Sequence, residues 1–512
     1  MLHPRVHAQK APGKPAYIMA KTGEVVTYGE LEQGANRCSR FFRDIGLQPN
    51  DHIAIMMENN KEYLQVVFAA QVAGLFYTTI STHLKTAEIE YIINDCQARV
   101  FITSRKYENL AGELLDKIPD AEHRLMIGGV TQGYRSYEET VAPYPAEPIP
   151  ECNEGKDMLY SSGTTGRPKG IVPTREAFPF GAVHPAAQGM IALYQLNEQT
   201  VYLSPAPLYH AAPLRYCTWT LRTGGTVIIM EKFDPEEALA LIEKYKVTTS
   251  QWVPTMFIRM LKLPEEVRKK YDLSSLGIAI HAAAPCPIEV KDQMIEWWGP
   301  VIFEYYAGTE GNGFFAISSE EWLRHKGSVG RCFIGQVRIC DENENILPPY
   351  EPGTIYIEGG VPFEYHNDPD KTAESRTSQG WNTLGDIGYV DEEGYVYLTD
   401  RKANMIISGG VNIYPQEAEN VLTMYPKVAD VAVIGVPNED FGEEVKAIVQ
   451  PVDMSEAGPE LARELMEYCH QHLSKIKCPK GVDFNPQLPR TPTGKLFKRL
   501  LKESYWNKAQ AN

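Results

Sequence analysis

Apolar and polar positions alternate between residues 25 and 130 in a pattern that predicts strands interleaved with helices. Val25-Val26 forms a short strand pattern, and a helical pattern opens at Tyr28-Gly29-Glu30-Leu31. His52 to Met57 and Ala98 to Thr103 are short apolar runs bounded by polar residues, as in buried strands. Strands that alternate with helices indicate βαβ units and a parallel sheet.

A second series of this kind extends from Thr200 to Tyr306. It contains a strand pattern from Thr226 to Met230 and a helical pattern from Pro235 to Lys246. From Gly327 to Leu398 the pattern changes to short strands separated by turns, which predicts a small antiparallel sheet or β-barrel.

The end of the chain returns to mixed helical and strand patterns. Val428 to Val436 is strand-like, and Pro459 to Leu473 is helical. The expected fold class is α/β, with a large N-terminal domain of two α/β subdomains plus a small β-barrel and then a small α+β C-terminal domain. The expected domains are residues 1–400 and 401–512, with the boundary between Asp400 and Ala403.

Length and charge narrow the class of protein. A chain of 512 residues is too long for one simple core. Its 43% hydrophobic and 23% charged residues are ordinary for a soluble globular enzyme. The formal net charge of −16 opposes nonspecific binding to nucleic acid or to an anionic membrane.

The cysteines and the apolar runs indicate a cytoplasmic protein. Nine scattered cysteines without a C-x-x-C pair suggest neither a disulfide framework nor a zinc site, and reduced thiols fit the cytosol best. The first residues lack the apolar core of a signal peptide. The least polar run, Leu64 to Ile80, reads as a buried helix that passes into a strand, so no membrane span is expected.

The stretch from Tyr160 to Gly170 has the composition of a phosphate-binding loop. It places hydroxyl side chains and two glycines ahead of Lys169, so backbone N–H groups, hydroxyl donors and a cation can all reach a polyphosphate. The Walker spacing is absent, and the residues after Lys169 read as a strand instead of a helix. The sequence therefore predicts a hairpin-type loop for a nucleoside triphosphate; the alternative is an ordinary surface turn.

This string resembles the signature of the acyl-adenylate-forming superfamily, which includes acyl- and aryl-CoA synthetases, peptide-synthetase adenylation domains and beetle luciferases. The resemblance covers nearly the whole chain, from Thr27-Tyr28-Gly29-Glu30-Leu31 to Gly494-Lys495. It implies that a carboxylic acid and ATP form acyl-AMP with release of pyrophosphate, and that the CoA thiolate then attacks. It also implies a mobile C-terminal domain, with ATP, Mg²⁺ and the co-substrate coenzyme A as cofactors.

The resemblance assigns a role to each motif of the nucleotide site. In Tyr305-Tyr306-Ala307-Gly308-Thr309-Glu310, Tyr306 would cover adenine, Thr309 would contact the α-phosphate or the carboxylate, and Glu310 would hold Mg²⁺. Asp386 and Arg401 would bind the ribose. The other implied nucleotide ligands are Ser161, Ser162, Gly163, Thr164, Thr165, Gly166, Lys169, Ala282, Ala283 and Ala284, with Thr164 as a second Mg²⁺ ligand.

Three further motifs concern the acid and CoA. His210 would orient or gate the acyl group, and Lys495 would reach from the C-terminal domain to the α-phosphate and carboxylate. Gly409-Gly410 would line the tunnel of the thioester step after the small domain rotates. The implied catalytic residues are thus His210, Thr309, Glu310 and Lys495. Trp252, Pro254, Tyr306, Gly308 and Gly311 would lie near the acyl pocket.

The sequence departs from the family pattern at several positions. Ala307 stands where glycine is commoner and narrows the room beside the acyl pocket, while Ala403 and Asn404 replace charged residues at the hinge. Val411 replaces a polar residue. For Arg215 a structural or surface role is favoured over contact with a distal carboxylate of the acid.

The leading interpretation is an AMP-forming carboxylic acid:CoA ligase for a hydrophobic acid, either a fatty acid or an aryl or arylalkanoic acid. Its partners would be that acid, ATP and CoA, with no nucleic acid and no membrane span; a homodimer is compatible with the sequence. The alternatives are an adenylating enzyme that loads a carrier protein, a luciferase-like oxidative enzyme and a catalytically silent binding protein. Lys169, Glu310, Asp386 and Lys495 argue against the silent protein.

Overall fold

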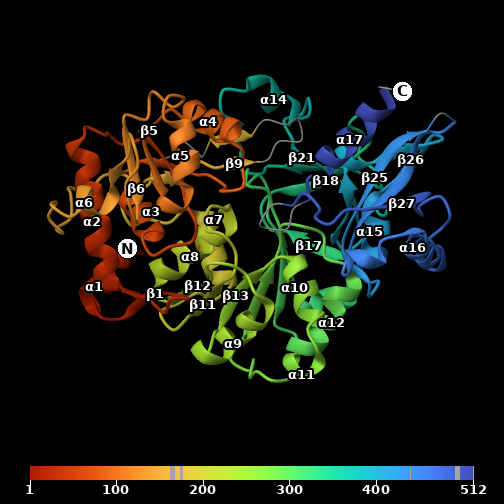
Figure 1. The fold of residues 1–512 in the computed structure, drawn as a ribbon, viewed down its shortest axis with the longest axis horizontal. Helices are drawn as coiled ribbons and strands as arrows, with labels where there is room; N and C mark the ends of the chain where they lie inside the picture. Colours follow the sequence, from red (N-terminus) through yellow and green to blue (C-terminus); the bar gives the residue numbers. More distant parts are fainter. Residues whose placement is uncertain (162–167, 173–176, 439, 491–495, 511–512) are drawn as a thin grey trace.

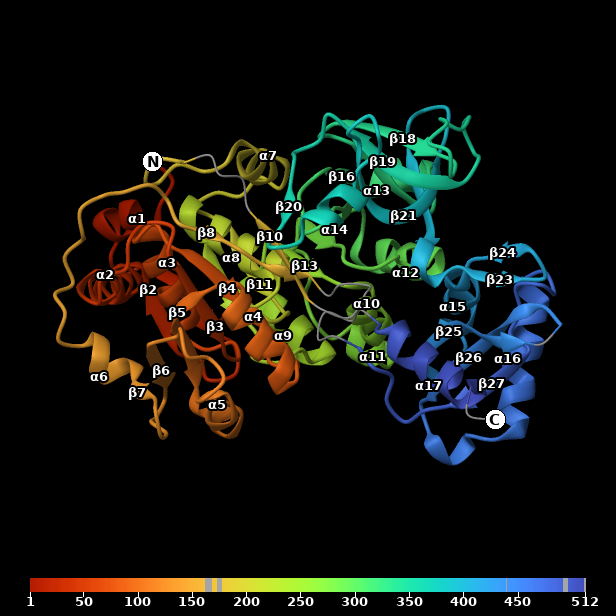
Figure 2. The same cartoon turned by 90° about the horizontal axis from the view of Figure 1, so that it is seen from above.

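The structure is a computed structural model. It describes residues 1–161, 168–172, 177–438, 440–490 and 496–510, and of residues 401, 402 and 508–510 it describes the backbone alone. Figures 1 and 2 place the C-terminal residues, drawn in blue, at one end of the molecule and the first sheet, drawn in red and orange, at the other.

The first part of the chain folds around a parallel sheet. Among the described residues this sheet has six strands in the order β7-β6-β5-β3-β4-β8. The central strands β3, β4 and β5 are buried along nearly their whole length because helices cover both faces of the sheet. The strands are β3 His52–Met56, β4 Phe76–Thr79, β5 Ala98–Ser104, β6 His123–Ile127, β7 Arg135–Ser136 and β8 Lys156–Asp157. The helices are α1 Pro4–Lys10, α2 Tyr28–Asp44, α3 Tyr63–Val72, α4 Thr86–Asp95, α5 Glu108–Leu114 and α6 Tyr137–Val141, with a short 3-10 helix η1 at Arg105–Tyr107.

The second part builds another parallel sheet. Neighbouring strands follow the order β15-β14-β13-β11-β12-β1 in parallel, and the antiparallel strands β2 and β16 flank them. Its strands are β1 Pro15–Met19, β2 Val25–Thr27, β11 Val201–Ser204, β12 Thr226–Ile229, β13 Thr249–Trp252, β14 Ile278–His281, β15 Ile302–Tyr306 and β16 Phe315–Ser318. Its helices are α7 Pro185–Leu193, α8 Ala211–Thr223, α9 Pro235–Tyr245, α10 Pro254–Leu261, α11 Glu265–Arg268, α12 Ile288–Trp298 and α13 Ser319–Arg324.

The strands predicted as a small β-barrel form an antiparallel segment in the order β18-β19-β21-β22-β17, which continues through β16 into the second parallel sheet. They are β17 Ser328–Cys332, β18 Gln336–Cys340, β19 Gly353–Glu358, β21 Asn382–Val390 and β22 Val396–Arg401. A small separate sheet contains β9 Tyr160–Ser161, β10 Lys169–Val172 and β20 Glu364–Tyr365, and α14 Pro369–Glu374 follows β20.

The last residues form an α+β unit. Its sheet begins five residues after β22 ends, beyond the short 3-10 helix η2 Lys402–Asn404. The strands are β23 Ile406–Ser408, β24 Val411–Ile413, β25 Val428–Asn438, β26 Gly442–Pro451 and β27 Gly481–Phe484. The helices are α15 Pro415–Thr423, α16 Pro459–His472 and α17 Lys498–Gln510, with a 3-10 helix η3 at Met454–Glu456. The division into residues 1–400 and 401–512 stays a prediction.

Local sequence signals explain where the helices begin. Thr27 and Glu30 form a reciprocal capping box at the start of α2, and Asp234 caps α9 just ahead of Pro235. The run Leu64 to Ile80 is a buried helix followed by strand β4, as predicted. Within the described ranges, none of the helices combines the length and the apolar character that crossing a lipid bilayer requires.

Candidate active site

The two strands of the predicted hairpin are present. Strands β9 and β10 pair antiparallel, with Ser161 opposite Lys169. Strand β20 pairs with the other edge of β10 and sets Tyr365 opposite Ile171. Lys169 precedes Ile171 by two residues and is therefore a diagonal neighbour of Tyr365 on the same face. Ser162, Gly163, Thr164, Thr165 and Gly166 lie outside the described residues.

Asp95, the last residue of α4, fixes this hairpin to the first α/β unit. The Tyr160 hydroxyl donates to Oδ2 of Asp95 at 2.5 Å, and the Asn367 amide donates to Oδ1 at 3.2 Å. The His366 backbone N–H donates to the Gly170 carbonyl at 2.8 Å. One carboxylate thus holds both the strand that enters the phosphate loop and the segment after Tyr365.

Glu310 and Lys169 meet at a tyrosine that sequence reasoning missed. The Tyr365 hydroxyl donates to Oε1 of Glu310 at 3.0 Å, while the Lys169 ammonium lies 5.1 Å from the centre of the Tyr365 ring. Burial lowers the pKa of Lys169, and repulsion from Lys371 lowers it further. The half-buried Thr309 lies in the same turn as Glu310.

Gly308 makes room for the Glu310 carboxylate. A Cβ added at Gly308 would lie 2.6 Å from Oε2 of Glu310 and 2.6 Å from Cδ1 of Leu384. Any larger residue would therefore displace the carboxylate. Among the described residues no group of three or more His, Cys, Asp or Glu side chains forms a ready metal cage.

The predicted adenine and ribose residues also come together. The Tyr306 hydroxyl donates to Oδ2 of Asp386 at 2.6 Å, and Asp386 is buried, with 7% of its surface exposed. Arg401 lies opposite Asp386 in the ladder between β21 and β22. Tyr306 is the last residue of β15 and Asp386 lies midway along β21, so two strands far apart in the sequence bring these side chains together.

The predicted alanine loop follows β14 directly. Ala282 is buried and its N–H donates to the Trp252 carbonyl at 3.3 Å, whereas Ala283 adopts a left-handed backbone with φ of 76°. Such a conformation is strained for alanine, costing on the order of 1–3 kcal/mol, and is typical of ligand-binding loops. Ala284 is half-buried.

A buried ion pair underlies this loop. Lys291 Nζ lies 2.6 Å from Oε2 of Glu304, and His281 Nε2 lies 3.5 Å from the same oxygen. Burial raises the pKa of Glu304, Lys291 opposes that shift, and burial lowers the pKa of His281. Glu304 precedes Tyr306 by two residues on β15, so the pair supports both the loop and the tyrosine. Single charged residues give no sequence signal for such a partnership.

His210 immediately precedes α8. Its ring centre lies 4.6 Å from that of Tyr209. The preceding loop is held by Asn59, whose Oδ1 accepts from the Leu208 N–H at 2.8 Å, and by Thr79, whose hydroxyl donates to the Tyr209 carbonyl at 2.9 Å. The position of His210 is thus fixed from the first α/β unit.

Two ion pairs hold α8 against the segment that leads into the phosphate hairpin. Arg215 Nη2 lies 2.7 Å from Oδ2 of Asp157, in agreement with the structural role favoured for this arginine. Two helical turns later, Arg222 pairs with Glu154. The seven helical residues from Arg215 to Arg222 span roughly 10 Å, and so do the three extended residues from Glu154 to Asp157. The two arginines are therefore spaced to pair with the two acids.

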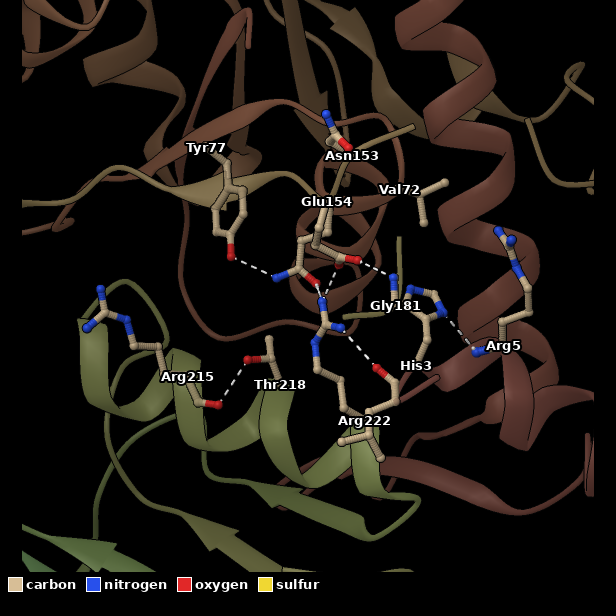
Figure 3. A network of polar contacts seen from close by, with 12 residues as sticks. His3, Arg5, Val72, Tyr77, Asn153, Glu154, Gly181, Arg215, Thr218 and Arg222 are labelled. Carbon is tan, nitrogen blue, oxygen red and sulfur yellow. Dashed lines mark hydrogen bonds and ion pairs between the residues drawn. The ribbon is translucent and has the colours of Figure 1, made fainter. Parts of the chain in front are cut away.

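Arg222 is the centre of a buried polar network, shown in Figure 3. Its guanidinium donates to Oε1 of Gln71 at 2.7 Å and to the Leu2 carbonyl at 3.0 Å, besides pairing with Glu154. Oε2 of Glu154 accepts from the Gly181 N–H at 2.7 Å. The network joins the N-terminal residues, α3 and α8 to the chain that enters the phosphate hairpin.

The structure describes two of the three C-terminal candidates. Gly409 and Gly410 form the exposed turn between β23 and β24; a Cβ added at Gly409 would meet Phe441 alone within 4 Å, and one at Gly410 nothing. At the expected hinge, the Asn404 side chain donates to Oδ1 of Asp400 at 3.1 Å, so this substitution keeps a polar contact. Lys495 lies outside the described residues.

Comparison with known proteins shows the family of this chain. The family model of the AMP-binding enzymes matches residues 5–363, and that of the AMP-binding enzyme C-terminal domain matches residues 417–495. The chain therefore belongs to the AMP-binding enzyme family, as its motifs predicted.

Individual relatives cover nearly the whole chain. A long-chain-fatty-acid–CoA ligase of Mycobacterium tuberculosis is 32% identical over 508 residues, which span 98% of this chain and 97% of the relative. A feruloyl-CoA synthase of an Amycolatopsis species is 33% identical and spans 93% of each chain. The crystal structure of ATP-bound MatB from Rhodopseudomonas palustris superposes with a TM-score of 0.81 at 27% identity, covering 98% of this chain and 99% of that one.

Proposed function

We propose that this protein is an AMP-forming carboxylic acid:CoA ligase. It would join a hydrophobic acid, either a fatty acid or an aryl or arylalkanoic acid, first to AMP with release of pyrophosphate and then to CoA. The main support for the proposal is that Lys169 and Glu310 both contact Tyr365. This arrangement puts a cation suited to phosphate near a carboxylate suited to a metal ion. The similarity to both a long-chain-fatty-acid–CoA ligase and a feruloyl-CoA synthase supports the range of acids.

The predicted site residues would each bind one part of the substrates in the first step. Lys169 and Ser161 would bind the triphosphate, Thr309 would contact the α-phosphate or carboxylate, and His210 would contact the acyl group. The adenosine would lie between Tyr306 and the alanine loop, with its ribose on Asp386 and Arg401. The acid supplies the attacking carboxylate oxygen, and pyrophosphate leaves with the electron pair of the broken P–O bond.

The residues present fit Mg²⁺. This ion is usually held by one or two carboxylates together with substrate phosphates and water, instead of a protein cage. Glu310 offers such a carboxylate among the described residues, and the proposal adds Thr164 as a second ligand. Bound there, the ion would neutralise charge on the phosphates.

The second step would use the C-terminal domain. We propose that residues 401–512 rotate as a body, withdraw Lys495 from the acyl-AMP and present Gly409 and Gly410 to the pantetheine arm of CoA. The left-handed φ of 56° at Gly409 and 80° at Gly410 gives a tight turn without side chains, which suits close approach of a ligand.

A screen for pyrophosphate release tests the function. Purified protein, ATP and Mg²⁺ would be incubated with a panel of fatty, aryl and arylalkanoic acids, and acyl-CoA would be measured after CoA is added. AMP and acyl-CoA should appear with at least one hydrophobic acid. Thioester on a holo carrier protein but not on CoA would favour the carrier-loading alternative, and no AMP with any acid would refute adenylation.

Asp386 gives a prediction about the sugar. Asp386→Ala should raise the KM for ATP about 10- to 100-fold, because charged hydrogen bonds to the ribose hydroxyls are lost. The matched control removes the 2′-hydroxyl from the ligand. 2′-Deoxy-ATP should be a poorer substrate than ATP for the parent enzyme, and the difference between the two nucleotides should be smaller for Asp386→Ala. An unchanged preference for ATP in the variant would contradict the ribose contact.

We also expect a cytoplasmic protein that forms homodimers. Reduced cysteines suit that compartment, since all nine are free thiols and most are buried. Light scattering coupled to size-exclusion chromatography tests the assembly. A mass of one chain at micromolar concentration would contradict the dimer.

A further inference from the structure

Tyr365 lies between the two charged groups of the nucleotide site. Its hydroxyl bonds to Oε1 of Glu310 at 3.0 Å, and its ring faces the Lys169 ammonium at 5.1 Å. In the described part of the chain Lys169 and Glu310 form no ion pair with each other. The acid and the base each use a different part of one aromatic side chain.

The tyrosine is itself held in place from several sides. Its backbone pairs with β10 opposite Ile171, and its N–H donates to the Thr372 hydroxyl at 3.0 Å. The Phe363 ring contacts the Tyr365 ring edge-on, with centres 5.3 Å apart. Because strand, helix and core all fix it, the side chain is oriented before any ligand binds.

The same three residue types also meet on the surface at Tyr271, with a different result. There the Tyr271 hydroxyl donates to Oε1 of Glu236 at 2.8 Å and Lys270 lies 4.9 Å from the Tyr271 ring centre. Lys270 also pairs directly with Glu236 at 3.1 Å. At the surface the lysine and the glutamate pair directly, whereas Lys169 and Glu310 each contact a different part of Tyr365.

We propose that Tyr365 is a positioning residue of the nucleotide site that keeps Lys169 and Glu310 apart. The ring face stabilises the ammonium and the hydroxyl orients the carboxylate, so the two charges do not neutralise each other. The ammonium stays available to phosphate and the carboxylate to Mg²⁺. Oε1 is held by Tyr365 while Oε2 lies beside Gly308, which fixes the plane of the carboxylate. This inference rests on the proposed function.

Nucleotide binding by calorimetry tests the inference without a catalytic turnover. A non-hydrolysable ATP analogue would be titrated at several Mg²⁺ concentrations into the full chain and into Tyr365→Phe. The variant should need about tenfold more Mg²⁺ for half-maximal enhancement of binding, since partners of metal-binding carboxylates typically contribute 10- to 100-fold to affinity. Its affinity without Mg²⁺ should stay within about twofold of the parent, because the ring is kept.

Two comparisons separate positioning from general stability. Tyr365→Leu should weaken binding of the analogue even without Mg²⁺, because Lys169 loses the ring and can turn to Glu310. Tyr271→Phe removes the matched surface hydrogen bond and should change neither binding nor melting temperature. In a Glu310→Gln background, Tyr365→Phe should add less than a twofold further change in Mg²⁺ dependence, as expected of residues that act as a unit.

The outcomes are distinct. A parent protein that binds no nucleotide with Mg²⁺ refutes the proposed function. If the parent binds and Tyr365→Phe has the same Mg²⁺ dependence, the function stands and the role of Tyr365 is wrong. Additive effects of Tyr365→Phe and Glu310→Gln on the Mg²⁺ dependence of binding would likewise contradict the positioning role of Tyr365.

Discussion

Lys495→Ala is expected to slow formation of acyl-AMP by about 10²- to 10³-fold, the usual effect of removing one group that stabilises developing charge. In the proposed first step the ammonium bridges the α-phosphate and the attacking carboxylate, and its flexible stem lets it act from the C-terminal domain. The second step does not use it. Thioester formation from acyl-AMP supplied ready-made should therefore fall less than about threefold.

The two half-reactions are measured separately to check this. Exchange of labelled pyrophosphate into ATP reports the first, and release of AMP from synthetic acyl-AMP and CoA reports the second. Lys475→Ala, an exposed lysine of the same domain, is the control and should leave both unchanged. Equal losses in both half-reactions would contradict the separate use of Lys495.

Arg222→Met is expected to lower the free energy of unfolding by about 3–5 kcal/mol. The substitution keeps most of the side-chain volume but leaves Glu154, whose side chain is 8% exposed, without its cationic partner. Gln71 and the Leu2 carbonyl lose a donor as well. Denaturant unfolding of the full chain, followed through its first transition, measures the loss.

Matched variants show whether burial causes the effect. Arg499→Met removes an exposed pair with Glu503, where both side chains are about half exposed, and should cost about 0–1 kcal/mol. Arg222→Met combined with Glu154→Gln should regain part of the loss, because the unpaired buried charge is gone. A double variant less stable than Arg222→Met alone would contradict this account.

Repeating patterns in the sequence predicted much of the fold. The strand pattern at His52 was confirmed as β3, the helical pattern from Pro235 as α9 and that from Pro459 as α16. The strand after Lys169 was confirmed as part of a hairpin and not a helix. These elements are specified by residues close in sequence, through periodicity, caps and turns.

The rest depends on pairing between distant residues. The strands predicted as a small barrel continue through β16 into a parallel sheet, because strand order across a sheet has no local signature. Tyr306 and Asp386 were each predicted, but their hydrogen bond was not. Tyr365, Asp95 and the Lys291–Glu304 pair were missed, since a lone tyrosine or charge reads as an ordinary surface residue.

One contact between the second α/β part of the chain and the C-terminal α+β unit bears on the order of the steps. The Lys262 ammonium, at the end of α10, donates to the Val428 carbonyl at the start of β25 at 2.6 Å, and burial lowers the pKa of this lysine. The proposed rotation of residues 401–512 would break that hydrogen bond, at a net cost of about 1.5–3 kcal/mol because the donor is a charged ammonium. Under the proposed function, a bound reaction intermediate would have to favour the rotated arrangement by more than this amount, so the contact would oppose rotation of residues 401–512 before adenylation.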